Sequence, residues 1–134
     1  MPHLIIEYSA NIEQELKLPE LIECLHDSTA EIEAFPRAGL RTRTTKRDNF
    51  FIADGHPDNS FVHVTLRIKS GRSMEIKKDA AEIIFKSLTD YLSPLLDTNP
   101  LAISFEIQEI DPALSFRQGN IREHLKLRSS AKND

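Results

Sequence analysis

The chain has 134 residues, a formal net charge of −4 and a sequence pI of about 5.7. This length suits one domain, and the acidic charge argues against a general affinity for nucleic acid, which needs a basic surface. A single cysteine, Cys24, excludes an intrachain disulfide and favours a reducing, cytoplasmic setting. No apolar run approaches the ~20 residues of a membrane helix, so no membrane is expected as a partner.

Proline is the second residue and directly precedes the apolar run 4–8, which is typical of a strand. Removal of Met1 before so small a residue would leave Pro2 with a free secondary amine. A free α-amino group titrates near ~7.7–8.0, and burial or nearby cations would lower that pKa. Pro2 is therefore a candidate general base. The alternative is that Pro2 is only a tolerated first residue of an edge strand.

A helix and a second strand are predicted to follow. Apolar residues recur at helical spacing from Leu18 to Ile32. Pro19 suits the first turn of this helix, and Phe35-Pro36 ends it. Residues 40–47 alternate in part and are rich in threonine, which favours a strand, and a turn is predicted over 54–59.

The same order of elements then recurs. Residues 61–68 alternate between apolar and polar side chains, which predicts a strand with one apolar face. Ser73 is a candidate N-cap for a helix whose apolar residues run from Ile76 to Leu92. Pro94 and Pro100 bracket the predicted end of this helix. Residues 101–109 are predicted to form the last strand.

Two units of similar length, about 2–50 and 60–110, indicate a duplicated β-α-β fold of the α/β (α+β) class. The two strands of each unit would be parallel, because a right-handed crossover joins them. Both helices would then cover one face of a four-stranded sheet. The other face also carries apolar groups, which predicts a homo-oligomer. We expect a single domain over 1–127 and a polar, disordered tail over 128–134.

Three arginines are candidates for binding an anion. Arg41 and Arg43 lie two residues apart on a predicted strand and so point to the same face. Arg72 follows Gly71 at a strand-to-helix turn, where the exposed amides of the helix also favour an anion. Arginine offers a forked fit to carboxylate. The alternatives are a solvated strand surface for the pair and an ordinary surface arginine for Arg72.

Other chemical motifs are absent from the sequence. The five histidines lack the spacing of a zinc site. There is no glycine-rich nucleotide-binding motif and no nucleophile elbow. No metal and no nucleotide cofactor are therefore expected.

These features together resemble the tautomerase superfamily, and within it the 5-carboxymethyl-2-hydroxymuconate Δ-isomerases. The resemblance extends to about residue 118, but Thr44–Phe51 departs from it, being more basic and lacking tryptophan at the expected rim of the pocket. The segments that carry it are Pro2-His3 with the strand after it, Phe35-Pro36-x-Ala38-Gly39-x-Arg41-x-Arg43, Ala53-Asp54-Gly55, Phe61-Val62-His63-x-Thr65-Leu66, Gly71-Arg72-Ser73 and Leu101-Ala102-x-Ser104-Phe105-Glu106-Ile107.

The resemblance implies a cofactor-independent isomerase that assembles as a homotrimer around an inner barrel of sheets, with no metal. It implies a small carboxylate-bearing substrate from the bacterial breakdown of homoprotocatechuate. Pro2 would be the catalytic residue, Arg41 and Arg72 would bind substrate, and Arg43 would be a possible helper. Two alternatives stay open: a tautomerase for another 2-hydroxydienoate or a phenylpyruvate-type enol, and a non-catalytic oligomeric domain that binds a metabolite.

Overall fold

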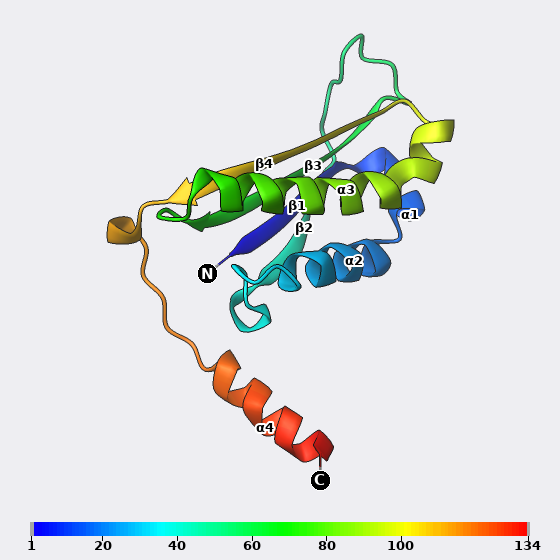
Figure 1. Cartoon of the computed structure of the whole chain (residues 1–134). Helices are drawn as coiled ribbons and strands as arrows, with labels where there is room; N and C mark the ends of the chain where they lie inside the picture. Colours follow the sequence, from blue (N-terminus) through cyan, green and yellow to red (C-terminus); the bar gives the residue numbers. More distant parts are fainter. Residues whose placement is uncertain (1, 134) are drawn as a thin grey trace.

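The structure, a computed structural model, describes the backbone of residues 2–133 and the side chains of residues 2–130. Four strands form one sheet in the order β2-β1-β3-β4 (Figure 1). The strands are β1 (His3–Ser9), β2 (Arg41–Arg47), β3 (Ser60–Lys69) and β4 (Leu101–Ile110). The predicted four-stranded sheet is confirmed.

The pairing of the strands confirms the predicted duplication. β1 and β2 are parallel, and so are β3 and β4. The two units meet in the middle of the sheet, where β1 and β3 pair antiparallel with His3 opposite Arg67. The start of β1, the start of β2 and the end of β3 therefore lie at the same end of the sheet.

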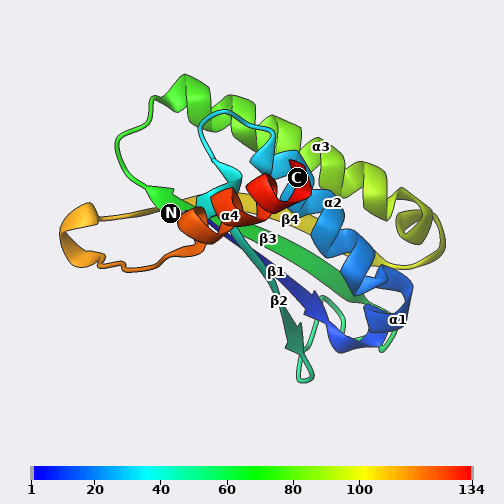
Figure 2. The same cartoon turned by 90° about the horizontal axis from the view of Figure 1, so that it is seen from below.

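Two helices cover one face of this sheet, α2 (Leu18–Ala30) and α3 (Met74–Thr98) (Figures 1 and 2). The hydroxyl groups of Ser28 and Ser87 join the two helices at 2.6 Å. The face of the sheet toward the helices is apolar because alternate residues of each strand point the same way. Its fully buried members on the two central strands are Leu4, Ile6, Val62, Val64, Leu66 and Ile68.

The helix boundaries follow local sequence signals with one exception. Pro19 lies in the first turn of α2, and the Ser73 hydroxyl accepts the Ile76 N–H at 3.2 Å, which caps α3. Pro94, however, lies inside α3 rather than beyond it. Proline removes one donor to the preceding turn, and near the end of a helix the exposed carbonyl can turn to water. The helix therefore continues to Thr98.

The opposite face of the sheet, called the open face below, is not covered by any described helix (Figure 2). Ile5, Phe61 and Ile110 are the large apolar side chains that it carries, as predicted, but charged and polar groups dominate it. Those on the described strands include His3, Glu7, Arg41, Arg43, Arg47, His63, Arg67, Ser104, Glu106 and Gln108.

Short helical turns fill two of the connections. A 3-10 helix, η1 (Ala10–Ile12), and α1 (Glu13–Leu16) lead into α2, and η2 (Arg37–Gly39) precedes β2. The turns at 10–16 have too few residues to show a helical period, so the sequence did not predict them. The segment Thr44–Phe51, expected at the rim of the pocket, runs toward the end of the sheet opposite Pro2, because β2 is parallel to β1. Within one chain it does not border Pro2.

Beyond β4 the chain leaves the sheet through η3 (Pro112–Leu114) and an extended segment to α4 (Ile121–Asn133) (Figure 1). Residues 128–133, where the sequence predicts a polar tail, continue α4. Good helix formers around a half-buried Leu125 and contact with η2 account for this. Asp134 lies outside the described residues. None of the described helices is long and apolar enough to cross a membrane.

Candidate active site

Pro2 is buried immediately before β1. Its carbonyl oxygen accepts the backbone N–H of Arg41 at 3.2 Å, so the first residue of β2 is bonded to Pro2. The ladder between β1 and β2 thus fixes Pro2 at the end of a central strand. This position is rigid because the residues that follow pair on both sides, with β2 and with β3.

Arg72 lies at the same end of the sheet, five residues beyond Arg67, the partner of His3. Its Nη2 donates to the carbonyl of Ala34 at 2.9 Å and its Nη1 to that of Lys69 at 3.5 Å. The guanidinium carbon stands 5.0 Å from the centre of the buried Phe35 ring. A guanidinium has five N–H groups, so these contacts orient Arg72 and leave donors for a carboxylate.

Arg41 and Arg43 lie together on the open face, as the alternation of β2 predicted. His3 lies between them: Arg41 Nη1 is 3.4 Å from its Nε2, and Arg43 Nη1 is 3.1 Å from its Nδ1. Pro2 and His3 are consecutive in an extended chain, so their side chains point to opposite faces. The structure therefore joins Pro2 to Arg41 through the backbone, and places Arg72 on the helix side of the sheet.

Two residues of this region were not singled out from the sequence, His3 and Arg67. His3 lies opposite Arg41 on one side and opposite Arg67 on the other, because β1 pairs with both β2 and β3. Alternation within β1 and β3 gives the face of each side chain, but only the pairing register brings them into one row. The sequence therefore predicted which face of the sheet each side chain occupies, but not which residues pair across neighbouring strands.

The surroundings of His3 favour its neutral form. Its pKa is lowered from the usual value by partial burial, and then by the positive charges of Arg43, Arg41 and Arg67. Protonation would add a fourth positive charge to this cluster. The surroundings therefore disfavour the protonated form of His3.

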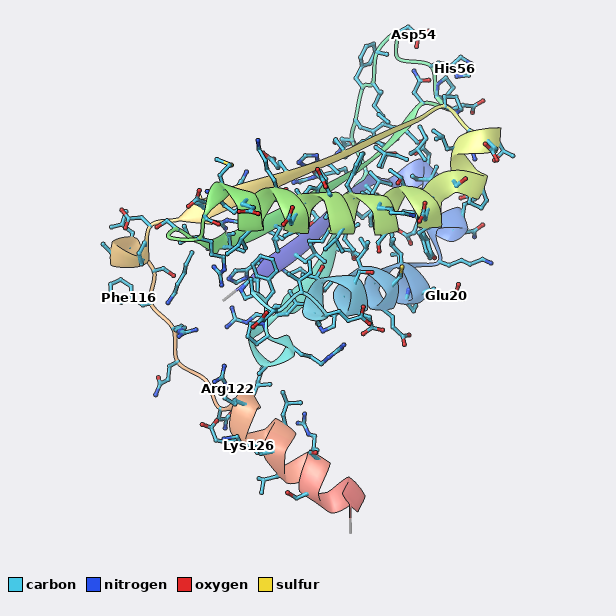
Figure 3. The ribbon with its side chains drawn as sticks, in the orientation of Figure 1. Glu20, Asp54, His56, Phe116, Arg122 and Lys126 are labelled. Carbon is cyan, nitrogen blue, oxygen red and sulfur yellow. The ribbon has the colours of Figure 1, made fainter. Side chains whose placement is uncertain are left out.

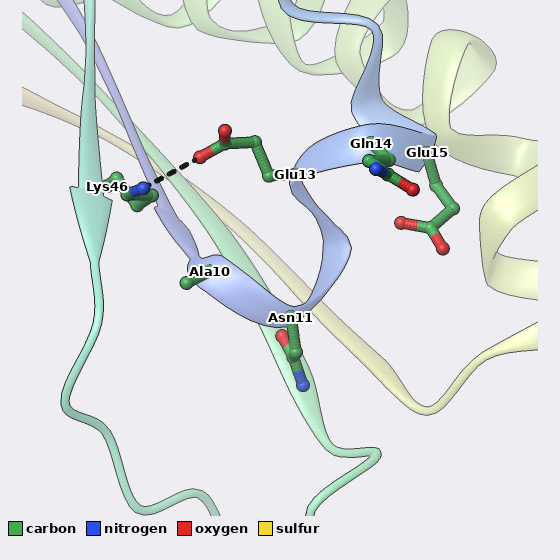
Figure 4. A pocket seen from close by; sticks show the side chains of 6 residues that line it. All are labelled: Ala10, Asn11, Glu13, Gln14, Glu15 and Lys46. Carbon is green, nitrogen blue, oxygen red and sulfur yellow. Dashed lines mark ion pairs between the residues drawn. The ribbon is translucent and has the colours of Figure 1, made fainter.

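A shallow hollow lies at the other end of the sheet, near the end of β1 (Figure 4). It encloses about 330 Å³ between Glu13 and Lys46, whose charged groups are 3.5 Å apart. Glu13 also accepts the hydroxyl of Tyr8 at 2.9 Å. Burial, together with this hydrogen bond, raises the pKa of Tyr8 to about 12. These groups satisfy one another, and none of the predicted site residues lies here.

The remaining histidine of interest, His63, is held by neighbours on β4. Its Nδ1 lies 2.6 Å from the Ser104 hydroxyl and its Nε2 lies 2.9 Å from the Glu106 carboxylate. Both ring nitrogens of His63 are thus engaged on the sheet surface. Among the described residues, no group of three or more His, Cys, Asp or Glu side chains is arranged to hold a metal ion.

Comparison with known proteins gives a consistent result over most of the chain. The model of the 5-carboxymethyl-2-hydroxymuconate isomerase family matches residues 2–125. A 5-carboxymethyl-2-hydroxymuconate Δ-isomerase of Escherichia coli is 40% identical over 126 residues, which are 94% of this chain and 100% of that protein.

Solved structures extend the likeness to the fold. The crystal structure of a 5-carboxymethyl-2-hydroxymuconate isomerase from Deinococcus radiodurans R1 superposes with a TM-score of 0.85 at 34% identity, over 92% of this chain and 93% of that one. A fused 4-OT protein, solved as an asymmetric trimer, superposes with a TM-score of 0.66 over 92% of this chain and 98% of that one. At 16% identity this second likeness shows the fold alone.

We expect the free energy of unfolding to fall as pH decreases from about 7.5 to about 5.5, partly because of His3. A histidine whose pKa is lower in the folded state binds its proton more readily when unfolded, so acid favours unfolding below the ordinary value. Urea denaturation at several pH values and one protein concentration measures this slope.

The variant His3→Gln should show a smaller slope, and His124→Gln, which changes an exposed residue of α4, should show the native one. An unchanged slope in His3→Gln would contradict the assignment.

Proposed function

Since the chain belongs to the 5-carboxymethyl-2-hydroxymuconate isomerase family, it is an isomerase of that compound, and we propose that Pro2 moves the proton in the reaction. The observation that carries the proposal is the position of Pro2. It lies within the matched residues, is buried at the end of the central strand, and is bonded through its carbonyl to the first residue of β2. Removal of Met1 gives this fixed residue a basic nitrogen.

The reaction needs a base and an acid at one place. The substrate is a 2-hydroxydienoate that bears several carboxylates. As a neutral amine, Pro2 takes the proton of the 2-hydroxyl group, and the electrons of the O–H bond form the 2-oxo group while the conjugated double bonds shift. Pro2 then returns the proton to a distal carbon, which gives the unsaturated 2-oxo acid. A positioned group of this kind contributes ~10²–10⁴-fold to the rate.

Arg41 and Arg72 supply the positive charge that this chemistry requires. We assign them to the carboxylates of the substrate and to the charge that develops on the 2-oxygen. Their charges also disfavour protonation of a free amine at Pro2, so they help to keep it basic. Arg43 lies on the same face of β2 as Arg41, and we assign it a supporting role in binding the substrate. Contacts of Arg72 with Ala34 and Phe35 preorganise its guanidinium.

The same proposal places the protein in the homoprotocatechuate pathway and in the cytoplasm, where its single cysteine would stay reduced. We also propose that residues 1–127 form one domain, in which the helices and the sheet share one core.

Blocking the nitrogen of Pro2 should abolish most of the activity. Inserting one alanine between Met1 and Pro2 turns the amine into an amide, and we expect kcat to fall about 10²–10⁴-fold. The measurement is the ultraviolet absorbance change of 5-carboxymethyl-2-hydroxymuconate.

The matched control carries the same alanine after Asp134 and should keep native activity. Intact mass spectrometry shows whether Met1 has been removed from each protein. Full activity of the insertion variant would rule out Pro2 as the base.

Replacing Arg72 or Arg41 by alanine should lower kcat/KM by roughly 10–100-fold each, because a hydrogen bond to a charged group contributes about 1.5–3 kcal/mol. Arg37→Ala is the control, because Arg37 is an exposed arginine paired with Asp27 at 2.9 Å. Arg72→Lys keeps the positive charge but loses the forked guanidinium group, so its kcat/KM should lie between those of the native protein and of Arg72→Ala. Native kcat/KM in a folded Arg72→Ala variant would contradict its role.

We further propose that the protein is a homotrimer held partly by its C-terminal arm, defined as residues 111–130. Leu114 and Phe116 are 79% and 93% exposed, and Figure 3 shows Phe116 on the segment between η3 and α4, away from the sheet. This arm contains four of the 17 Lys and Arg residues but only two of the 21 Asp and Glu residues. A basic arm with exposed apolar side chains suits the acidic surface of a second copy.

The double variant Leu114→Ser/Phe116→Ser should dissociate more readily than the native protein. Burying each side chain contributes about 1.5–3 kcal/mol, so the dissociation constant should rise by at least about tenfold. Sedimentation over a range of protein concentrations measures it, with Leu96→Ser, a half-exposed position on α3, as the control. A monomeric native protein would overturn the trimer, and unchanged dissociation of the double variant would overturn the role of the arm.

A further inference from the structure

Three strands bring positive side chains into one cluster on the open face, here called the His3 cluster. It consists of His3 on β1, Arg41 and Arg43 on β2, and Arg67 on β3. His3 pairs with Arg41 on one side and with Arg67 on the other, and Arg43 Nη1 reaches its Nδ1 at 3.1 Å. The cluster is built on paired strands, so its geometry is fixed by the sheet rather than by a loop.

Hydrogen bonding within this cluster is mismatched. Both ring nitrogens of His3 face arginine N–H donors, at 3.4 Å from Arg41 and 3.1 Å from Arg43. A neutral imidazole accepts at one nitrogen only and carries a hydrogen on the other. In one of the two contacts, therefore, an arginine N–H faces the N–H of His3. The two arginine donors that reach His3 thus share a single acceptor nitrogen. If His3 were protonated, both contacts would place two N–H donors opposite each other.

Nearby acids do not supply a further acceptor. Glu7 pairs with Arg47 at 2.6 Å, and Glu106 is bonded to His63 at 2.9 Å. Among the described side chains, neither Arg43 nor Arg67 forms an ion pair with a carboxylate. His3, Arg43 and Arg67 therefore have no acidic partner among the described side chains.

We propose that His3, Arg43 and Arg67 form a binding site for an oxyanion, a carboxylate or a phosphate, on the open face of the sheet. Two oxygens of such a group can accept from both guanidinium groups at once, and a third contact satisfies the N–H of His3. The site shares only Arg43 with the proposed substrate site and does not depend on Pro2. The occupant is either a carboxylate of the substrate or a free anion, and both present the same chemistry.

Inorganic phosphate is the probe, and the imidazole resonances of His3 are the readout in the full-length protein. At constant ionic strength set with chloride, phosphate should shift these resonances saturably and raise the pKa of His3, because the bound anion offsets Arg43, Arg41 and Arg67. Arg67→Gln should weaken phosphate binding by about fivefold or more, since one charge-assisted contact is lost. Arg67 is exposed, so this variant should keep its fold.

Arg47→Gln is the matched control, because Arg47 lies on the same face but pairs with Glu7. It should bind phosphate as the native protein does. No saturable shift up to about 20 mM phosphate, a range that covers a weak anion site, would overturn the proposal. Equal weakening in Arg47→Gln and Arg67→Gln would also overturn it, because binding would then reflect general charge only.

Kinetics identify the occupant once phosphate binding is established. If the occupant is a substrate carboxylate, phosphate inhibits competitively and Arg67→Gln raises KM with kcat retained. If it is a free anion, phosphate binding leaves KM unchanged. Either result supports the site, and because the resonances are read without turnover, the test stays valid if Pro2 is not the base.

Discussion

The antiparallel pairing of β1 with β3 is the constraint on which the rest of the structure depends. Each β-α-β unit by itself has a two-stranded sheet with one helix, which cannot enclose a core. Joined through β1 and β3, the units form four strands whose alternate residues bury one continuous apolar layer under α2 and α3. The same pairing sets the end of β3 beside the start of β1, and so sets Arg72 near Pro2.

The two faces of the sheet consequently have different tasks. The face under the helices supplies stability, because its side chains are fully buried and apolar. The open face carries histidines, arginines and acids that pair across strands, as Glu7 does with Arg47 and His63 with Glu106. Pro2 stands at the end of the sheet between these two environments, held by its bond to Arg41. The buried apolar layer thereby holds Pro2 and its polar neighbours in fixed positions at the end of the sheet.

Family membership and local geometry support different parts of the functional account. The match over residues 2–125 establishes an isomerase of 5-carboxymethyl-2-hydroxymuconate. The roles that we propose for Pro2, Arg41 and Arg72 rest on their positions in this chain. Arg72 is oriented by two carbonyls and an aromatic ring on the helix side of the sheet. Arg41 lies on the open face, in contact with His3. The two arginines approach from different sides, so a substrate that meets both needs carboxylates that are well separated.

Sequence alone determined the strands, the two long helices and the duplicated order, because alternation and helical spacing are local properties of the chain. It also placed Arg41 and Arg43 on one face and identified Ser73 as a cap. The tertiary structure decided what depends on contacts between distant segments. It set the register that surrounds His3 with Arg41, Arg43 and Arg67, the continuation of α3 past Pro94, and the contact of α4 with η2. Pairing partners are chosen by the whole core, and no short window of sequence contains them.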